Sequence, residues 1–217
     1  MREVAMADLP FVNRKQAGRL LGAELASRKL ENVVVLALPR GGVPVGLEVA
    51  KALNAPLDVV VVRKLGVPWQ PELAMGAIAG GTRVLDRDVI RAYGIPSSQV
   101  EAVVEAETQE MRRREQLFRG GQPALNLHGR TVVLVDDGLA TGSTMVSAAR
   151  CVRTLHPEAL IVAVPVGSRQ ACHRLEKEAD ECVCLAIPEP FAAVGEWYED
   201  FRQVSDQEVQ EILSRAG

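Results

Sequence analysis

Five short runs of β-branched and other apolar residues recur along the chain, and segments with helical patterns separate them. Each run is nearly continuous rather than alternating, which is the pattern of a strand that is buried on both faces of a parallel sheet. The runs are Val33–Leu38, Leu57–Val62, Thr131–Val135, Leu160–Val166 and Cys182–Ile187. Strands that alternate with helices predict an α/β fold in which helices flank both faces of a five-stranded parallel sheet.

The position of a long insertion predicts the strand order. Two strands precede the insertion and three follow it, so we expect the order 2-1-3-4-5, counted along the chain. Ligands of such sheets bind at the carboxyl ends of the strands that flank the point where the order reverses. The two segments that follow these strands are Pro39–Gly42, called the first loop below, and Asp136–Thr144, called the second loop. The sequence therefore predicts a binding site where the two loops meet.

Helix starts and turns give the remaining elements. Side chains that can accept hydrogen bonds from first-turn amides predict helix caps at Asn13, Asp86, Ser98 and Ser205. A long helix is predicted over Ser98–Phe118, with acidic residues early and arginines late, as the helix dipole favours. Glycines and prolines predict that Lys64–Glu72 is a mobile loop, followed by a hairpin that turns at Gly80-Gly81.

The length and charge limit the domain organisation and the partners. A chain of 217 residues suits a single domain with an appendage. We expect a core of about residues 13–63 and 131–187, and a hood of about residues 64–130 and 188–217. With 25 Lys and Arg against 28 Asp and Glu, the net charge of −3 excludes a broad basic face for nucleic acid. An anionic ligand must therefore be bound locally.

Membrane and disulfide signals are weak in this sequence. The run Val33–Leu38 is far shorter than the roughly 20 residues that span a bilayer, and the first ten residues, MREVAMADLP, lack the apolar run of a signal peptide. The cysteines form no CxxC pair and no disulfide-like framework; they are Cys151, Cys172, Cys182 and Cys184. We interpret them as small buried residues in a reducing, cytoplasmic setting, with a metal pair at Cys182 and Cys184 as the alternative.

The second loop carries the most specific chemistry. Asp136 and Asp137 directly follow a buried strand, and a turn rich in hydroxyl groups and glycine then opens a helix. The N–H groups and the positive dipole of such a helix start suit a phosphate, whereas the two carboxylates would repel it. The acids suit neutral diol hydroxyls or a metal. A diol at one end and a phosphate at the other describe a ribose 5-phosphate.

The thirteen residues Val132–Thr144 resemble the signature for 5-phosphoribosyl-1-diphosphate (PRPP) in type I phosphoribosyltransferases. The strand and helix pattern extends the resemblance over about residues 30–187. The Pro-Arg-Gly-Gly of the first loop, the VRKLG segment and the tail FAAVGEWYEDF look like a bacterial subgroup of unknown substrate. The resemblance implies a type I phosphoribosyltransferase core with a small hood.

This resemblance implies Mg²⁺-dependent displacement of pyrophosphate from PRPP by a nitrogen nucleophile, such as a nucleobase. Asp136 and Asp137 would hold the ribose hydroxyls and, together with substrate and water, the Mg²⁺ ion. The 5′-phosphate is assigned to the end of the second loop: Ala140, Thr141, Gly142, Ser143 and Thr144. The pyrophosphate is assigned to basic residues and glycines: Arg40, Gly41, Gly42, Arg63 and Lys64. In the family, the first loop often contains a cis peptide bond that does not precede proline.

The acceptor is less well defined. Enzymes that act on 6-oxopurines usually carry an acid at the position of Ala140, which favours adenine- or orotate-type acceptors. The tail instead resembles a purine-binding hood, in which Phe191 would stack on the base with Val194 and Trp197 nearby. Equally, these three residues could pack the hood onto the core. Glu72, the only carboxylate of the predicted mobile loop, is the candidate proton acceptor.

Two alternatives stay open. One is a PRPP- or nucleotide-binding regulatory protein that has lost transferase activity, and the other is a diphosphokinase or structural relative that uses the same loop. The intact first loop favours transfer chemistry. We expect no membrane or nucleic acid partner, and the resemblance is compatible with a homodimer.

Overall fold

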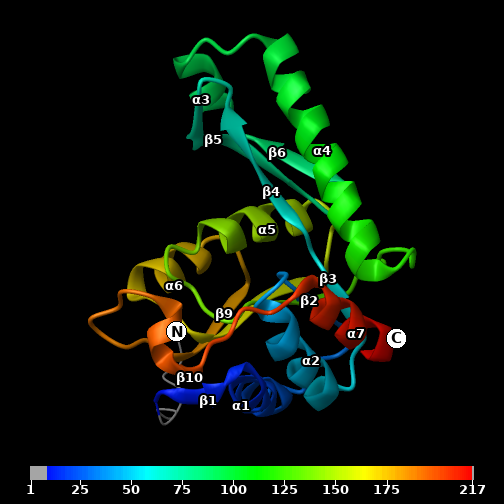
Figure 1. Ribbon diagram of the computed structural model, residues 1–217, viewed down its shortest axis with the longest axis vertical. Coiled ribbons are helices and arrows are strands. Elements are labelled where there is room, and N and C mark those ends of the chain that lie inside the picture. Colours follow the sequence, from blue (N-terminus) through cyan, green and yellow to red (C-terminus); the bar gives the residue numbers. More distant parts are fainter. Residues whose placement is uncertain (1–8, 217) are drawn as a thin grey trace.

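The computed structural model describes residues 9–216 (Figure 1). Most of the first ten residues, in which no signal peptide was predicted, lie outside the described residues. The core is one five-stranded parallel sheet in the order β3-β2-β7-β8-β9. Its strands are β2 (Val33–Ala37), β3 (Leu57–Val59), β7 (Thr131–Val135), β8 (Ala159–Val166) and β9 (Glu181–Ala186). The predicted parallel α/β sheet and its order 2-1-3-4-5 are confirmed.

Both faces of this sheet are covered, which explains why its strands are continuously apolar. Alternate residues of a strand point to opposite faces, so Val33 and Val35 of β2 lie in one apolar cluster and Val34 in another. The first cluster includes α1 (Arg14–Ala26) and α2 (Gly42–Leu53). The second cluster includes α5 (Ser143–Arg153) and α6 (Arg169–Leu175). Figure 1 shows these helix pairs on the two sides of the sheet.

The insertion, residues 64–130, forms a separate layer that rises from the core (Figure 1). Strands β4 (Val62–Val67), β5 (Gln70–Ala79) and β6 (Thr82–Leu85) form an antiparallel sheet. The helices α3 (Arg87–Ala92) and α4 (Ser97–Arg119) follow it. The predicted turn at Gly80-Gly81 is confirmed, and it joins β5 to β6. The predicted second strand of the core is shorter than expected, because the chain leaves the core sheet after Val59 and enters β4.

The prediction that Lys64–Glu72 is a loop is wrong, because these residues belong to the β4–β5 hairpin. The hairpin turns at Pro68-Trp69. Its side chains Leu65, Val67 and Met75 are fully buried. Apolar burial therefore outweighs the glycine and proline content that suggested a loop. The prolines are accommodated in part by shifts of register between β4 and β5 near Gly66.

The C-terminal segment returns along the core. It contains the short helix η1 (Val194–Trp197), β10 (Tyr198–Asp200) and α7 (Asp206–Ala216). Strand β10 pairs in parallel with β1 (Phe11–Asn13), so the start of the described chain lies beside residues 198–200. Helix α7 packs near α2 and α4. The division of the chain into a core and a hood stays a proposal. Residues 188–216, which were assigned to the hood, lie along the core.

Three of the four predicted helix caps are confirmed. Asn13, Asp86 and Ser205 each accept a hydrogen bond from a backbone amide near a helix start. Ser98 is not a cap, because α4 begins at Ser97 after the extended Pro96. Cys182 and Cys184 lie in β9 as predicted, and all four cysteines are free. None of the described helices is both long and apolar enough to cross a membrane.

Candidate functional site

The first and second loops are in direct contact at the carboxyl ends of β2 and β7. A Cβ atom on Gly42 would lie 2.7 Å from the carbonyl oxygen of Val135 and 2.9 Å from the Cα atom of Asp136. A Cβ atom on Gly41 would overlap the Oδ2 atom of Asp137. The two glycines therefore allow the first loop to pack against the acid pair, Asp136 and Asp137. The predicted meeting point of the two loops is confirmed.

Each acid of the pair uses one carboxylate oxygen within the protein. The Asp137 backbone N–H donates to Oδ1 of Asp136 over 2.8 Å, and the Arg14 Nε–H donates to Oδ2 of Asp137 over 2.8 Å. Asp136 Oδ2 and Asp137 Oδ1 have no hydrogen-bond partner in another residue of the described chain. Neither oxygen is among the described side-chain atoms that are fully buried without a hydrogen-bond partner. One oxygen of each acid therefore remains available to a ligand.

Burial and mutual repulsion disfavour the charged forms of the acid pair. Desolvation raises the pKa of Asp136 well above its ordinary value, and the neighbouring Asp137 raises it further. Desolvation also raises the pKa of Asp137, while the adjacent Arg14 guanidinium opposes this rise. Such perturbed carboxyl groups beside a contact between two loops are typical of functional sites.

Two residues that contact Asp137 were not predicted from the sequence. Arg14, the first residue of α1, forms the ion pair described above, and the Tyr198 hydroxyl donates to the Asp137 carbonyl oxygen over 2.6 Å. Both partners are distant in sequence, and the β1–β10 pairing brings them to the acid pair. No local motif marks Arg14. Tyr198 lies in the tail that resembles a purine-binding hood, but that resemblance assigned roles only to Phe191, Val194 and Trp197.

The end of the second loop is held open at the start of α5. Gly142 precedes the helix with φ = 71° and provides no side-chain cap. The Ser143 amide donates to Thr141 Oγ1 over 3.4 Å, whereas no side chain of the described residues accepts from the next two first-turn amides. Neighbouring groups fix the loop, because Ser168 Oγ donates to the Ala140 carbonyl oxygen over 2.6 Å and Leu139 N donates to Val166 O. The hydroxyls of Thr141 and Ser143 lie 3.2 Å apart. The structure thus places backbone amides and hydroxyls together, as a phosphate site requires.

The adjacent residues Arg63 and Lys64 are not brought together. They point to opposite sides of β4, as successive residues of a strand do. Lys64 Nζ lies 3.2 Å from Ser143 Oγ of the second loop. Arg63 instead pairs with Glu107 of α4, with 2.6 Å between Nε and Oε2. Of these two residues, only Lys64 brings its positive charge to the second loop.

Arg40 extends from the first loop toward the C-terminal segment. Its guanidinium lies 3.6 Å from the Asp206 carboxylate at the start of α7, and both side chains are well exposed. The peptide bond between Pro39 and Arg40 is cis, which is the feature that the family resemblance suggested for this loop. The contact with Asp206 is exposed, so an anionic ligand could replace this carboxylate at little cost.

Of the three residues predicted to bind the base, Val194 contacts the second loop through Gly138, directly after the acids. The rings of Phe191 and Trp197 are 6.2 Å apart. All three side chains are half-buried against the core. The indole N–H of Trp197 is buried without a hydrogen-bond partner in the described residues. Glu72 is exposed in the irregular part of β5, and no described contact joins it to either loop.

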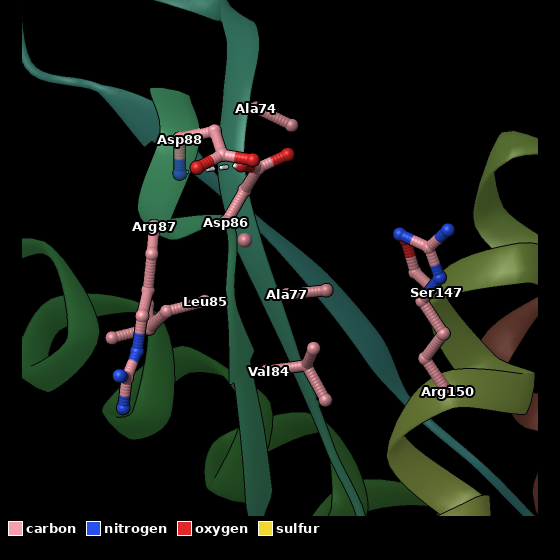
Figure 2. A pocket seen from close by; sticks show the side chains of 10 residues that line it. Ala74, Ala77, Val84, Leu85, Asp86, Arg87, Asp88, Ser147 and Arg150 are labelled. Atoms are coloured by element: carbon pink, nitrogen blue, oxygen red, sulfur yellow. Dashed lines mark hydrogen bonds between the residues drawn. The ribbon is translucent and has the colours of Figure 1, made fainter. Parts of the chain in front are cut away.

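A separate cleft lies between the insertion and α5. Figure 2 shows Asp86 and Asp88 on the insertion side and Ser147 and Arg150 on the α5 side. The cavity measures about 370 Å³. Ser147 is one helical turn beyond Ser143, but none of the site residues predicted from the sequence lines this cleft.

Residues 12–200 match the family model described as the phosphoribosyl transferase domain, so the chain belongs to that family. A Mycobacterium tuberculosis protein named "Putative phosphoribosyl transferase Rv0571c" is 49% identical over 207 residues, which are 95% of this chain and 47% of the relative. The chain therefore spans about half the length of this curated relative.

The chain is also similar to two further proteins. The crystal structure of TT1426 from Thermus thermophilus is 44% identical and has a TM-score of 0.88. This match covers 96% of this chain and 99% of TT1426. A ribose-phosphate pyrophosphokinase of Pyrococcus furiosus is 36% identical over 74 residues, which cover 33% of this chain and 26% of that protein. The likeness to the pyrophosphokinase is confined to a third of the chain.

Proposed function

We propose that this chain binds PRPP and transfers its 5-phosphoribosyl group to a nitrogen nucleophile with release of pyrophosphate. The observation that supports this proposal most is the direct contact of the first loop with the acid pair. This contact brings the first loop, with its arginine and two glycines, next to two carboxylates and the second loop, which leads into the N-terminus of α5. PRPP has three parts of matching chemistry: a diphosphate, a diol and a phosphate.

The second loop suits the two ends of the ribose 5-phosphate. The 5′-phosphate would accept hydrogen bonds from first-turn amides and from Thr141, Ser143 and Thr144. Lys64, which already contacts Ser143, would add charge at this phosphate rather than at the pyrophosphate. Asp136 and Asp137 would each accept from a ribose hydroxyl through the oxygen that the protein leaves free.

The acid pair also fits a limited role in holding Mg²⁺. Carboxylate oxygens suit this cation, which keeps several waters and substrate phosphate oxygens in its coordination shell. Residues 9–216 contain no group of three or more His, Cys, Asp or Glu that could hold a metal by themselves. Asp136 and Asp137 would therefore supply few of the ligands. When bound, Mg²⁺ would stabilise negative charge on the departing pyrophosphate.

The first loop would hold the pyrophosphate. Arg40 is the charged group of this loop, and Gly41 and Gly42 allow backbone N–H groups to approach the ligand without side-chain obstruction. The transition state of a glycosyl transfer resembles an oxocarbenium ion, so stabilising the leaving group lowers the barrier. We leave Arg63 and Glu72 out of the proposed site, since Arg63 is bound by Glu107 and Glu72 lies in the irregular part of β5.

We propose a nucleobase as the acceptor. The neighbouring rings of Phe191 and Trp197 suit a planar ring, and Val194 of the same half-buried segment touches Gly138 directly after the acid pair. Ala140 provides no acid for a 6-oxopurine. The free cysteines favour a reducing, cytoplasmic location, and a homodimer stays a prediction.

Pyrophosphate release tests the proposal. The chain would be incubated with Mg²⁺, PRPP and a panel of nitrogen bases that includes adenine, orotate and 6-oxopurines. We expect one class of base to release pyrophosphate well above the background with PRPP alone. Tight PRPP binding without release for any base would instead support the regulatory alternative. Failure to bind PRPP at all would contradict both functions.

Lys64→Met is expected to weaken PRPP binding by about tenfold, because it removes one charge-assisted hydrogen bond to the 5′-phosphate. The matched control is Arg63→Met, which deletes the neighbouring positive charge on the opposite side of β4. Its PRPP affinity should stay within about twofold of the unchanged protein. Titration calorimetry with PRPP and Mg²⁺ measures both. Equal losses for the two variants would show that the described positions of Arg63 and Lys64 do not determine PRPP binding.

A further inference from the structure

Arg14 binds the acid pair more rigidly than a surface arginine could. The Arg14 and Asp137 side chains retain only 11% and 14% of their exposure, and 2.8 Å separates Nε from Oδ2. A second nitrogen of the same guanidinium donates to the Arg202 carbonyl oxygen over 2.8 Å. The guanidinium carbon also lies 3.8 Å from the centre of the Phe201 ring. Contacts with three residues thus fix the position of this charge.

The surroundings of Asp137 show what this contact achieves. Oδ2, the oxygen that Arg14 binds, is also the oxygen against which Gly41 packs. The backbone carbonyl of the same residue is held by the Tyr198 hydroxyl. Asp137 is therefore fixed at its main chain and at one carboxylate oxygen, while no other described residue donates a hydrogen bond to Oδ1. Rotation of the carboxylate would break the contact with Arg14.

The charge of Arg14 is also well placed. Two carboxylates beside a ligand that carries a phosphate and a diphosphate would repel it. One guanidinium within hydrogen-bond distance leaves the group of Asp136, Asp137 and Arg14 with a formal charge of −1 when both acids are ionised. The repulsion of the ligand is reduced without the loss of either diol acceptor.

We propose that Arg14 is a positioning residue of the PRPP site, which binds Asp137 Oδ2 and thereby orients Oδ1 toward a ribose hydroxyl. This inference rests on the proposed function. Arg14 acts through Asp137 and touches no part of the substrate. Because Arg14 contacts Phe201 and the carbonyl of Arg202, the same residue links the C-terminal segment to the acid pair.

Arg14→Met tests the inference against Arg28→Met as a matched control. Like Arg14, Arg28 is largely buried, with 12% of its side chain exposed, and it forms ion pairs with Glu24 and Glu181. It lies far from the acid pair, because Glu181 begins β9 at the amino edge of the sheet. We expect Arg14→Met to weaken PRPP binding by about 10–100-fold, by analogy with the loss found when the hydrogen-bond partner of a metal ligand is removed. Arg28→Met should leave PRPP affinity unchanged, although both variants lose thermal stability.

Arg14→Lys separates charge from geometry. Lysine retains the positive charge but lacks the rigid planar fork of arginine, so we expect it to recover only part of the affinity. It also keeps the test decisive should Arg14→Met fail to fold. Unchanged PRPP affinity in folded Arg14→Met, or in both variants, would assign Arg14 a purely structural role and overturn the inference.

A double-mutant cycle with Asp137→Asn identifies the route of action. If Arg14 acts through Asp137, then Arg14→Met should add less than about threefold to the loss already caused by Asp137→Asn. Full additivity would mean that Arg14 contacts PRPP itself, which contradicts a positioning role. If Asp137→Asn alone leaves binding unchanged, the proposed PRPP site fails. If only the Arg14 variants leave it unchanged, the site stands and this inference fails.

Discussion

Asp137→Asn is expected to weaken PRPP binding by about 10–100-fold while the protein remains folded. A hydrogen bond to a charged group contributes about 1.5–3 kcal/mol, which corresponds to this change in affinity. Asparagine retains the shape of the side chain but not its negative charge. The ribose hydroxyl near Oδ1 would therefore lose a charged acceptor, and the acid pair would hold any Mg²⁺ less well.

The fold should tolerate this change because burial already disfavours the ionised form of Asp137, whose pKa is raised. A neutral amide in the same place carries a smaller desolvation cost. It can still accept the hydrogen bond from Arg14 through its oxygen.

Asp58→Asn is the matched control for this variant. Asp58 is also a buried acid in an ion pair, with side-chain exposures of 9% for Asp58 and 11% for Arg119, and it contacts neither loop. We expect Asp58→Asn to lose stability but to retain PRPP affinity. Titration calorimetry and thermal unfolding of both variants measure the two effects. Unchanged PRPP affinity in Asp137→Asn would remove the acid pair from the site.

Gly41→Ala is expected to weaken both PRPP binding and folding through one methyl group. The backbone of Gly41 has φ = −61° and ψ = −34°, which alanine adopts without strain. The added Cβ atom, however, would overlap Oδ2 of Asp137. The carboxylate or the first loop must shift, and overpacking of this kind costs about 1–3 kcal/mol of folding stability. A displaced Asp137 would also bind ribose less well.

The clash can be isolated by removing its partner. In an Asp137→Ala background the overlapping carboxylate is absent, so the further loss of stability caused by Gly41→Ala should be close to zero. Gly129→Ala controls for general destabilisation, because Gly129 has φ = 66° and no atom within 4 Å of an added Cβ. That control should lower the melting temperature without changing PRPP affinity. An equal loss from Gly41→Ala in both backgrounds would contradict the proposed clash.

The strands of the core were predictable because burial on both faces favours apolar residues at nearly every position. The second loop was predictable for a related reason: its strand, acids, turn and helix start are contiguous. Predictions failed where tertiary burial outweighed local preference. The residues around Gly66 and Pro68 favour a loop when considered alone. Leu65 and Val67, however, become fully buried when these residues form the β4–β5 hairpin.

The alternation of side chains in β4 also changed the proposed site. Sequence adjacency suggested that Arg63 and Lys64 bind the same ligand group. In a strand they point to opposite sides, so Lys64 reaches Ser143 while Arg63 reaches Glu107. Once the segment is known to be a strand, this separation follows directly.

The parallel sheet and the two loops could be predicted from the sequence alone, because contiguous residues mark each strand and each loop. The strand order, and with it the meeting of the loops, followed from the position of the insertion and the general topology of parallel sheets. How the acid pair is held depends instead on long-range contacts. Arg14 and Tyr198 are 123 and 61 residues away from Asp137, and the pairing of β1 with β10 brings them to it. No local pattern encodes such contacts, because they depend on where two distant segments dock on a finished core.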